Sequence, residues 1–475
     1  MRTLLLNPPS YGGFDGGAGS RYQARREIRS FWYPTWLAYP AGLIPGSRLI
    51  DAPPEDIGVD EVVRRARDYD LVVMNTSTPT VMNDARTAEL LKEHYPGIVI
   101  GLVGPHTMVL PRETLALSKA IDFVTTGEFD YAVAEIAQGI PFDKVAGIAF
   151  RAGGGIRRTP GRPPIEELDA LPFVTEVYAR DLAIDNYAIG YLKHPYISFY
   201  TGRGCRSRCT YCLWPQTIAG HAYRVRSAEN VHEELVTAKR LFPQVKEFFF
   251  DDDTFTDTPS RAETIAQKIK PLGIAWSCNA RATVPKETLR KMKEAGLRLL
   301  VVGFESGNQK ILNNVRKGVR LDQARAFVKA TKELGILVHG TFILGLPGET
   351  PETMEETMRF ALELDPYSIQ VSLVAPYPGT ELYAQAVREG WLVQEGSGLV
   401  TDGIQNAAIA YSGLSRETIF ETVERFYRRF YLRPRPILRI VKDMLRDRDE
   451  FSRRVREGRE FFSFMAKRKE AVPTP

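Results

Sequence analysis

The sequence predicts an α/β protein in which an N-terminal Rossmann-like parallel sheet precedes a partial (β/α)6 barrel and a helical C-terminal region. Three observations support this class. Short apolar runs alternate with amphipathic helical segments in two separate series, a stretch rich in glycine and proline divides the two series, and no strand candidate follows residue 414. Continuous apolar strands that are joined by helices form parallel sheets covered on both faces.

Length and composition agree with a folded protein of several domains. The chain has 475 residues, more than one hydrophobic core accommodates, and 44% of them are apolar and 25% charged. No apolar run is long enough for a membrane span, and the opening MRTLLLNPPS lacks the features of a signal peptide. We therefore expect a cytoplasmic protein.

The first series occupies residues 1–145, which we predict to form one domain. Helical patterns at residues 59–66 and 81–93 lie among five strand candidates, which read RTLLLNPP, SRLIDAPP, DLVVMNTS, GIVIGLVG and IDFVTTGE. Ligands of such sheets bind at the carboxyl ends of the strands. The expected binding rim consists of the residues that follow three of these strands, namely Thr76, Ser77, Thr78, Gly104, Pro105, His106, Gly127 and Glu128.

The second series occupies residues 196–400 and follows a predicted linker over residues 146–195. Its strand candidates read YISFYTG, EFFFDDD, AWSCNAR, LLVVGFE, LVHGTFILG and SIQVSLV. Six successive βα units of this length indicate an open, partial barrel, and the chemistry of such barrels takes place at the C-terminal ends of the strands.

Three of the four cysteines lie in the loop GRGCRSRCTYCLWP, directly after the first barrel strand. Three thiolates can bind three irons of a four-iron cluster and leave the last iron open, as a catalytic metal site requires. Arg203, Arg206 and Arg208 are expected to offset the charge of the thiolates and sulfides. Cys278, on the third barrel strand, is either a fourth ligand or, as is typical of a lone strand cysteine, a small buried apolar residue.

The segment CRSRCTYC resembles the C-x3-C-x-aromatic-C loop of the radical S-adenosylmethionine (SAM) superfamily. The resemblance implies an enzyme whose Cys205, Cys209 and Cys212 hold a [4Fe-4S] cluster. The open iron of that cluster binds SAM, and an electron donor such as flavodoxin or ferredoxin drives reductive cleavage to a 5′-deoxyadenosyl radical. The same resemblance implies SAM contacts at Tyr211, Phe250, Asp251, Asp252, Arg281, Glu305, Ser306, Ile343 and Leu346.

Each of these matches has an alternative interpretation. The aspartates after the second strand could cap the next helix or bind Mg²⁺. Glu305 could be a structural partner of Arg281, and the glycines at 345 and 348 could form a turn without a ligand. No general acid, general base or radical relay is singled out by the sequence.

Residues 1–145 resemble the cobalamin-binding domain that precedes many radical SAM barrels, through LLLNPP, YPAGLIPG, NTSTPT, VGPHTMVLP and DFVTTGEFDYAVAEI. The resemblance implies that the rim residues bind cobalamin. One departure matters, since the chain has no D-x-H-x-x-G motif that would place a histidine below the cobalt. His106 is either a loop residue or a cobalt ligand, and cobalamin binding stays open at this stage.

Residues 401–475 are expected to form a basic helical region. Apolar residues at helical spacing over 437–445 and 451–465 are interspersed with arginine and lysine, which is typical either of membrane-surface binding or of a helix that covers one end of the barrel. Aromatic and basic residues do not alternate as in an RNA-binding module, so no nucleic acid partner is expected.

The opening loops and CTYCLWPQT look most like the hopanoid-biosynthesis-associated branch of this group. The leading hypothesis is therefore an enzyme that rearranges the ribose-derived side chain of a hopanoid lipid into a cyclitol ether. One alternative is a cobalamin-dependent radical SAM methyltransferase that acts on an unactivated carbon. The other is a non-catalytic iron–sulfur sensor or electron carrier.

Overall fold

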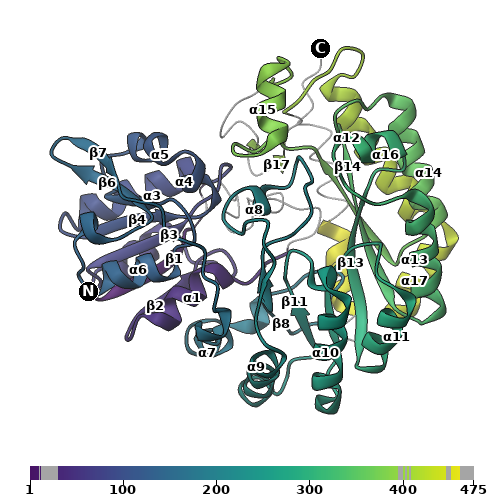
Figure 1. Cartoon of the computed structure of the whole chain (residues 1–475), viewed down its shortest axis with the longest axis horizontal. Helices are drawn as coiled ribbons and strands as arrows, with labels where there is room; N and C mark the ends of the chain where they lie inside the picture. Colours follow the sequence, from purple (N-terminus) through teal and green to yellow (C-terminus); the bar gives the residue numbers. More distant parts are fainter. Residues whose placement is uncertain are drawn as a thin grey trace.

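The computed structural model describes residues 1–9, 11, 30–393, 400–401, 404–405, 408–445 and 451–460. Figure 1 shows two α/β units side by side, the first in purple and blue and the second in teal and green. The part of the predicted tail beyond residue 460 lies outside the described residues.

The first unit is built on a sheet of seven strands in the order β2-β1-β3-β4-β5-β6-β7. All five strand candidates of the first series are confirmed, and the strands from β2 to β5 are parallel. Apolar runs form these strands because both faces of the sheet are buried. The parallel strands are β1 (Thr3–Asn7), β2 (Arg48–Asp51), β3 (Leu71–Asn75), β4 (Val99–Val103) and β5 (Phe123–Thr125). The helices are α1 (Thr35–Leu43), α2 (Val59–Ala66), α3 (Val81–His94), α4 (Pro105–Val109), α5 (Pro111–Leu117) and α6 (Asp130–Ala137).

The sheet continues into the segment that the sequence predicts to be a linker. Strands β6 (Ile148–Ala152) and β7 (Gly155–Arg158) form an antiparallel hairpin on its edge. Gly153 and Gly154 both have positive φ, as the two central residues of a type I′ hairpin turn require. Gly153 and Gly154 therefore form a tight turn between two strands. From the sequence, this glycine-rich stretch is predicted to be part of a linker. Helix α7 (Val174–Asp181) follows in the same segment.

The second unit is a partial barrel of six parallel strands whose order in the sheet follows the order in the chain. The strands are β8 (Tyr196–Phe199), β11 (Glu247–Phe250), β12 (Trp276–Ala280), β13 (Leu297–Glu305), β14 (Leu337–Leu344) and β15 (Ser368–Leu373). All six candidates of the second series are thus confirmed. The larger helices are α9 (Ala228–Leu241), α10 (Pro259–Ile269), α11 (Lys286–Glu294), α13 (Leu321–Glu333), α14 (Pro351–Leu364) and α16 (Arg416–Tyr431).

Shorter elements complete the second unit. They include β9 (Gly202–Arg203), α8 (Leu213–Gln216), β10 (Arg224–Val225), α12 (Gln309–Asn314), α15 (Glu381–Arg388), β16 (Val400–Thr401), β17 (Ile404–Gln405) and α17 (Pro434–Met444). Residues 451–460 are also helical. Within the described residues, no helix is both long and apolar enough to cross a membrane.

One hydrophobic cluster runs through both units. It contains Leu5 of β1 together with Phe249 of β11 and Phe342 of β14. At the junction, the ring of Trp36 stacks on that of Trp214 with a centroid distance of 5.7 Å and an interplanar angle of 4°. The first unit therefore packs against the segment that contains the predicted cluster loop.

Candidate active site

The three predicted cluster ligands line a single cavity of about 330 Å³, at the C-terminal ends of the barrel strands. Cys205 and Cys209 are buried, and Cys212 is partly exposed. Burial raises the pKa of Cys209 and of Cys212, and the positive charge of Lys317 acts in the opposite direction on both. Among the described residues, no group of three His, Cys, Asp or Glu side chains is arranged so that it could hold a single metal ion. The case for a cluster therefore depends on the shared cavity and the spacing of the thiols.

The cysteine loop is held in shape by one glutamine. The side-chain amide Nε2 of Gln216 donates to the backbone carbonyl oxygens of Cys209 (3.1 Å), Thr210 (3.1 Å) and Cys212 (2.8 Å). Gly204 precedes the first ligand with a φ of 93°, and a Cβ there would lie 2.2 Å from the carbonyl oxygen of Ala222. Only glycine fits this position in the observed loop conformation.

Cys278 does not line the cavity. It lies on β12, fully buried in the main hydrophobic cluster. The structure thus places it as a small apolar residue, away from the three cysteines of the loop.

A charged pair lines the same cavity, close enough to the cysteines for Lys317 to act on the pKa of Cys209 and of Cys212. Lys317 Nζ donates to Glu305 Oε1 at 2.7 Å and lies 3.4 Å from the hydroxyl of Tyr211. Arg281 instead donates to Ser207 and to the carbonyl oxygens of Lys317 (2.9 Å) and Gly318 (3.1 Å). The alternative pairing of Glu305 with Arg281 is therefore not formed, because Lys317 takes that place.

The structure divides the predicted SAM contacts into two groups. Tyr211, Arg281, Glu305 and Ile343 line the cavity together with the three cysteines. The others do not line it, and they comprise Phe250, Asp251, Asp252, Ser306 and Leu346. Direct contact of this second group with SAM is not supported by their position and stays a prediction.

Each residue of the second group has a structural partner. Asp252 accepts hydrogen bonds from the Thr201 backbone N–H (2.5 Å) and the Tyr223 hydroxyl (2.8 Å). Phe250 stacks on Phe255, and Ser306 Oγ lies 3.1 Å from Thr357 Oγ1. Asp251 accepts from Asn279, and Leu346 belongs to a separate apolar cluster.

Several cavity residues were missed by the sequence reasoning. Lys317 follows α12 in a loop without a motif, and nothing in its local sequence marks it. The strand residues do carry a signal, since alternate positions of a strand share one face. That rule selects Val301, Gly303 and Glu305 on β13, His339, Thr341 and Ile343 on β14, and Gln370 and Ser372 on β15, all of which line the cavity.

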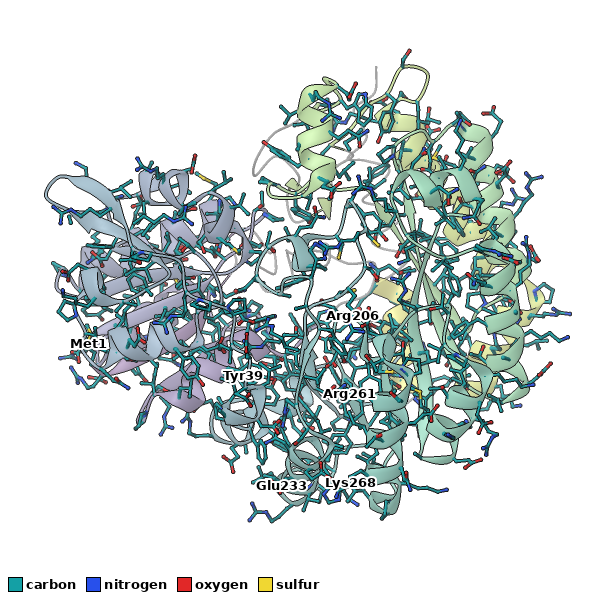
Figure 2. All side chains as sticks on the ribbon, in the orientation of Figure 1. Met1, Tyr39, Arg206, Glu233, Arg261 and Lys268 are labelled. Carbon is teal, nitrogen blue, oxygen red and sulfur yellow. The ribbon has the colours of Figure 1, made fainter. Side chains whose placement is uncertain are left out.

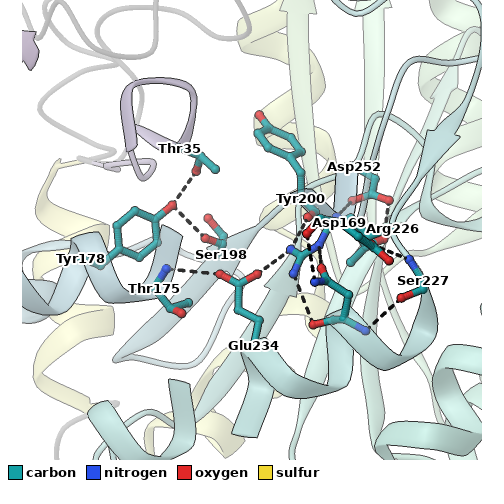
Figure 3. A network of polar contacts seen from close by, with 12 residues as sticks. Thr35, Asp169, Thr175, Tyr178, Ser198, Tyr200, Arg226, Ser227, Glu234 and Asp252 are labelled. Carbon is teal, nitrogen blue, oxygen red and sulfur yellow. Dashed lines mark hydrogen bonds and ion pairs between the residues drawn. The ribbon is translucent and has the colours of Figure 1, made fainter. Parts of the chain in front are cut away.

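A polar network below the cluster loop fixes the end of β8 (Figure 3). Glu234 accepts from Arg226 and from the backbone N–H of Thr175 at 3.2 Å. Arg226 in turn donates to the carbonyl oxygen of Tyr200 at 3.0 Å. The network joins α7, α9 and the residues that lead into the cysteine loop.

The rim of the first sheet carries small polar residues, as expected for a cofactor that approaches the backbone. Thr76, Ser77 and Thr78 follow β3 and are buried, and Gly104 follows β4 with a φ of 122°. Pro105 starts α4, and Gly127 has open space where a Cβ would lie. A Cβ on Gly104 would lie 2.4 Å from the carbonyl oxygen of Thr76. These residues fit a large flat cofactor held by backbone and hydroxyl contacts.

Two rim residues have other partners. His106 Nδ1 lies 3.0 Å from Thr78 Oγ1, and burial lowers the pKa of His106 to about 4. Glu128 accepts both guanidinium bonds of Arg224, at 2.7 and 2.8 Å, and the backbone N–H of Ile165 at 2.7 Å. Its contact with cobalamin stays a prediction.

Arg203 also differs from the expectation that it offsets the cluster charge. Its two terminal nitrogens each donate to Asp130 at 2.9 Å, and its guanidinium lies 4.6 Å from the ring centroids of both Trp36 and Tyr39. Tyr39 lies at the junction of the two units in Figure 2. Arg203 therefore connects the cysteine loop to the first unit, and Asp130 already neutralises its charge.

The first unit also reaches the mouth of the cavity. Tyr377, in the segment after β15, lines the cavity, and a Cβ on Gly379 would lie 2.5 Å from Val109 of α4. Trp214 lines the cavity and stacks on Trp36 of α1. The rim helix α4 and the cluster cavity are thus neighbours.

Comparisons with known proteins agree with this arrangement. A family model described as the B12 binding domain matches residues 24–137, and one described as the radical SAM superfamily matches residues 199–361. An uncharacterized methyltransferase of Pyrococcus horikoshii is 29% identical over 453 residues, which covers 93% of this chain and 95% of the relative. An anaerobic magnesium-protoporphyrin IX monomethyl ester cyclase of Rubrivivax gelatinosus is 28% identical over 417 residues, with 81% and 70% covered.

Solved structures show the same fold. The cobalamin-dependent SAM radical enzyme OxsB, with aqua-cobalamin and SAM bound, aligns with a TM-score of 0.68 at 14% identity, over 99% of this chain and 71% of that one. The radical SAM methyltransferase TsrM from Kitasatospora setae aligns with a TM-score of 0.63 at 16% identity, over 82% and 76%. The chain is therefore an enzyme of the radical SAM superfamily with a B12-binding domain ahead of its barrel, and a [4Fe-4S] cluster and SAM are its cofactors.

Proposed function

We propose that the protein is a cobalamin-dependent radical SAM methyltransferase. The observation that carries this proposal is the closeness of two sites, since the segment after β15 lines the cluster cavity and contacts α4 on the rim of the B12-binding unit. A methyl group carried at the rim would need only a short path to a substrate in the cavity. Two relatives that cover more than 90% of the chain are named methyltransferases, and one of them is a cytidylyl-2-hydroxyethylphosphonate methyltransferase of Streptomyces wedmorensis, 25% identical over 505 residues.

The residues present fit the cofactors. Cys205, Cys209 and Cys212 would hold the cluster, and the rim hydroxyls with Gly104 would hold cobalamin without a histidine from below. When bound, the cluster supplies the electron that cleaves SAM, and cobalamin supplies a carrier for the methyl group.

The charged pair on the cavity wall orients SAM in this proposal. Because Lys317 neutralises Glu305 at 2.7 Å, the carboxylate can face a ribose hydroxyl while Arg281 faces the methionine carboxylate. The cavity also exposes Leu213, Trp214 and Val374, whose apolar surface excludes water from a reactive intermediate.

The wall formed by β14 and β15 is suited to the substrate. Thr341, Gln370 and Ser372 present neutral hydrogen-bonding groups, and Gln370 Nε2 donates to Ser372 Oγ at 3.1 Å. We infer that this wall orients the part of the substrate that carries hydroxyl or amide groups.

The proposal is tested without knowledge of the substrate. The reconstituted enzyme, loaded with hydroxocobalamin and reduced, is incubated with SAM whose methyl group carries deuterium. We expect S-adenosylhomocysteine and deuterated methylcobalamin, both detected by mass spectrometry. Formation of 5′-deoxyadenosine without either product would contradict a methyltransferase. The Cys209→Ala variant controls for cluster-dependent cleavage, because it should form no 5′-deoxyadenosine.

A ring-forming rearrangement is the second candidate, because three relatives are named cyclases, and each aligns with 81% or more of this chain. In this candidate, 5′-deoxyadenosine forms and S-adenosylhomocysteine does not. The hopanoid side chain predicted as substrate is supported by the sequence resemblance alone, and none of the relatives named above carries a hopanoid in its name. Because the chain is a radical SAM enzyme, the alternative of a non-catalytic sensor or electron carrier is not favoured.

An electron donor such as flavodoxin or ferredoxin completes the proposal, because the cleavage of SAM consumes one electron. Arg206 and Arg208 flank the cluster ligands and are exposed, so an acidic carrier protein would find positive charge next to the cluster. Arg206 already has a neighbour in Asp257, at 3.4 Å, which moderates this charge.

A further inference from the structure

Helix α17 presents its apolar side to solvent. The exposed fractions are 45% for Ile437, 66% for Leu438, 43% for Val441 and 80% for Leu445. Residues spaced by three, four and seven positions lie on one face of a helix, so these four side chains form a continuous stripe. Leu432, just before the helix, is also 64% exposed. We call Ile437, Leu438, Val441 and Leu445 the α17 stripe.

Two polar residues of the same helix contact the barrel. Arg439 donates to Asp365 at 3.2 Å, and Asp443 accepts from the hydroxyl of Tyr367 at 2.6 Å. Arg433, at the start of the helix, donates to Asp365 at 2.8 Å. A surface helix of a soluble protein normally turns its apolar side to the core and its charges to water. Helix α17 departs from this rule along its stripe, because polar contacts attach the helix to the barrel while the four apolar side chains of the stripe are exposed.

Positive charge borders the stripe. Arg435 and Lys442 are exposed on the same helix. The one acidic residue of α17 is Asp443, which is turned toward Tyr367. The following helical segment repeats the arrangement, since Arg453 and Arg454 donate to the carbonyl oxygens of Leu192 and Gly190 while Phe451 is 49% exposed. The exposed surface is thus apolar with basic edges.

We propose that the α17 stripe and its basic border dock onto the surface of an anionic lipid bilayer. The helix lies in the interfacial plane, the four apolar side chains enter the boundary between headgroups and acyl chains, and Arg435 and Lys442 contact lipid phosphates. A second copy of the chain fits this surface less well, because pairing α17 with itself would bring cation against cation. Anionic lipid supplies the complementary charge together with an apolar phase.

The docking surface is separate from the catalytic machinery. Asp365 and Tyr367, which hold α17, precede the start of β15, whereas the cluster loop follows the end of β8. Because the strands are parallel, these positions belong to opposite ends of the barrel. No residue of α17 lines the cluster cavity. The bilayer would therefore leave the mouth of the cavity uncovered, and failure of the docking proposal leaves the proposed function untouched.

Vesicle sedimentation tests the proposal with the full chain. The reconstituted protein is mixed with vesicles of phosphatidylcholine containing phosphatidylglycerol, and with vesicles of phosphatidylcholine alone. We expect binding to the anionic vesicles that weakens as salt is raised. The double variant Arg435→Gln/Lys442→Gln should bind about 30-fold more weakly, because each basic residue near an anionic surface contributes roughly 1 kcal/mol.

Two further variants separate the stripe from a general loss of folding. Leu438→Glu places a charge in the stripe and should abolish binding, whereas Val236→Glu changes another exposed apolar residue, 45% accessible on α9, and should bind normally. Iron content and the thermal midpoint should match the parent protein in both variants.

Three outcomes would overturn the proposal. The first is that the parent protein fails to bind anionic vesicles. The second is that Leu438→Glu converts a dimer to a monomer without changing vesicle binding, which would make the stripe a self-association surface. The third is that removal of residues 461–475 abolishes binding while Leu438→Glu has no effect, which would assign binding to the last residues of the chain.

Discussion

The buried guanidinium of Arg203 offers a direct test of how the two units are joined. The side chain of Arg203 is 1% exposed and that of its partner Asp130 is 0% exposed. Burial alone lowers the pKa of Arg203, but the attraction of Asp130 and Glu128 outweighs this effect and raises the pKa. Replacing Arg203 with methionine keeps an unbranched apolar stem but removes the guanidinium, with its charge and all its donors.

The expected cost follows from these contacts. Removing one partner of a buried ion pair costs about 3–5 kcal/mol, because the remaining charge stays desolvated. Loss of the cation–π contacts with Trp36 and Tyr39 adds roughly 0.5–1 kcal/mol for each ring. We therefore expect Arg203→Met to destabilise the protein by about 4–7 kcal/mol, a large share of the stability of a typical protein. The double variant Arg203→Met/Asp130→Leu should recover most of the loss, since no unpaired charge remains.

Denaturant unfolding of the reconstituted protein measures both effects, and iron content reports on the cluster loop. Because Arg203 lies two residues before Cys205, the single variant should also retain less iron. Arg298→Met is a matched control, since this arginine pairs with Glu247 at 2.8 Å but is 17% exposed and lies away from the loop. A stability loss below about 1 kcal/mol for Arg203→Met, or a double variant no more stable than the single one, would refute the reasoning.

Three further predictions concern the site and the first unit. Cys209→Ala should remove cluster iron and the absorption of the cluster, whereas Cys278→Ala should keep both, and iron loss from the second variant would make it a ligand. Lys317→Ala should weaken SAM binding at least tenfold in calorimetry of the reconstituted enzyme, because Glu305 becomes an unpaired buried charge, and unchanged affinity would contradict a role for the pair. Burial raises the pKa of Asp51 to about 7, so the stability this group contributes is complete below about pH 4, its unfolded value, and is lost as the pH rises through 7. The unfolding midpoint of Asp51→Asn should therefore fall less between pH 5 and pH 8 than that of the parent, and parallel curves would argue against this titration.

The strand pattern and the predicted cluster ligands followed from local sequence. Each apolar run is buried on both faces, so it is identifiable without knowledge of its neighbours, and all eleven candidates form strands. The three cysteines belong to one short loop, and all three line one cavity. The hairpin of β6 and β7 was missed because its glycines are equally typical of a loop.

The cavity wall was predictable only in part. Ile343 and Glu305 lie on strand faces that point inward, whereas Phe250 and Ser306 lie next to inward-facing positions and turn to the core. Successive residues of a strand point to opposite faces of the sheet. A motif therefore places a side chain only when the residues that face the cavity are also known.

The sequence by itself determined the class of protein and the strand segments, and it predicted the cluster ligands, because each of these depends on residues that are neighbours in the chain. Only the tertiary structure decided which charges meet, because the partners come from distant segments. In the folded chain Arg203 pairs with Asp130, Lys317 pairs with Glu305, and Arg224 pairs with Glu128. The tertiary structure also turned the apolar side of α17 outward, since the orientation of an amphipathic helix is set by what its polar face binds.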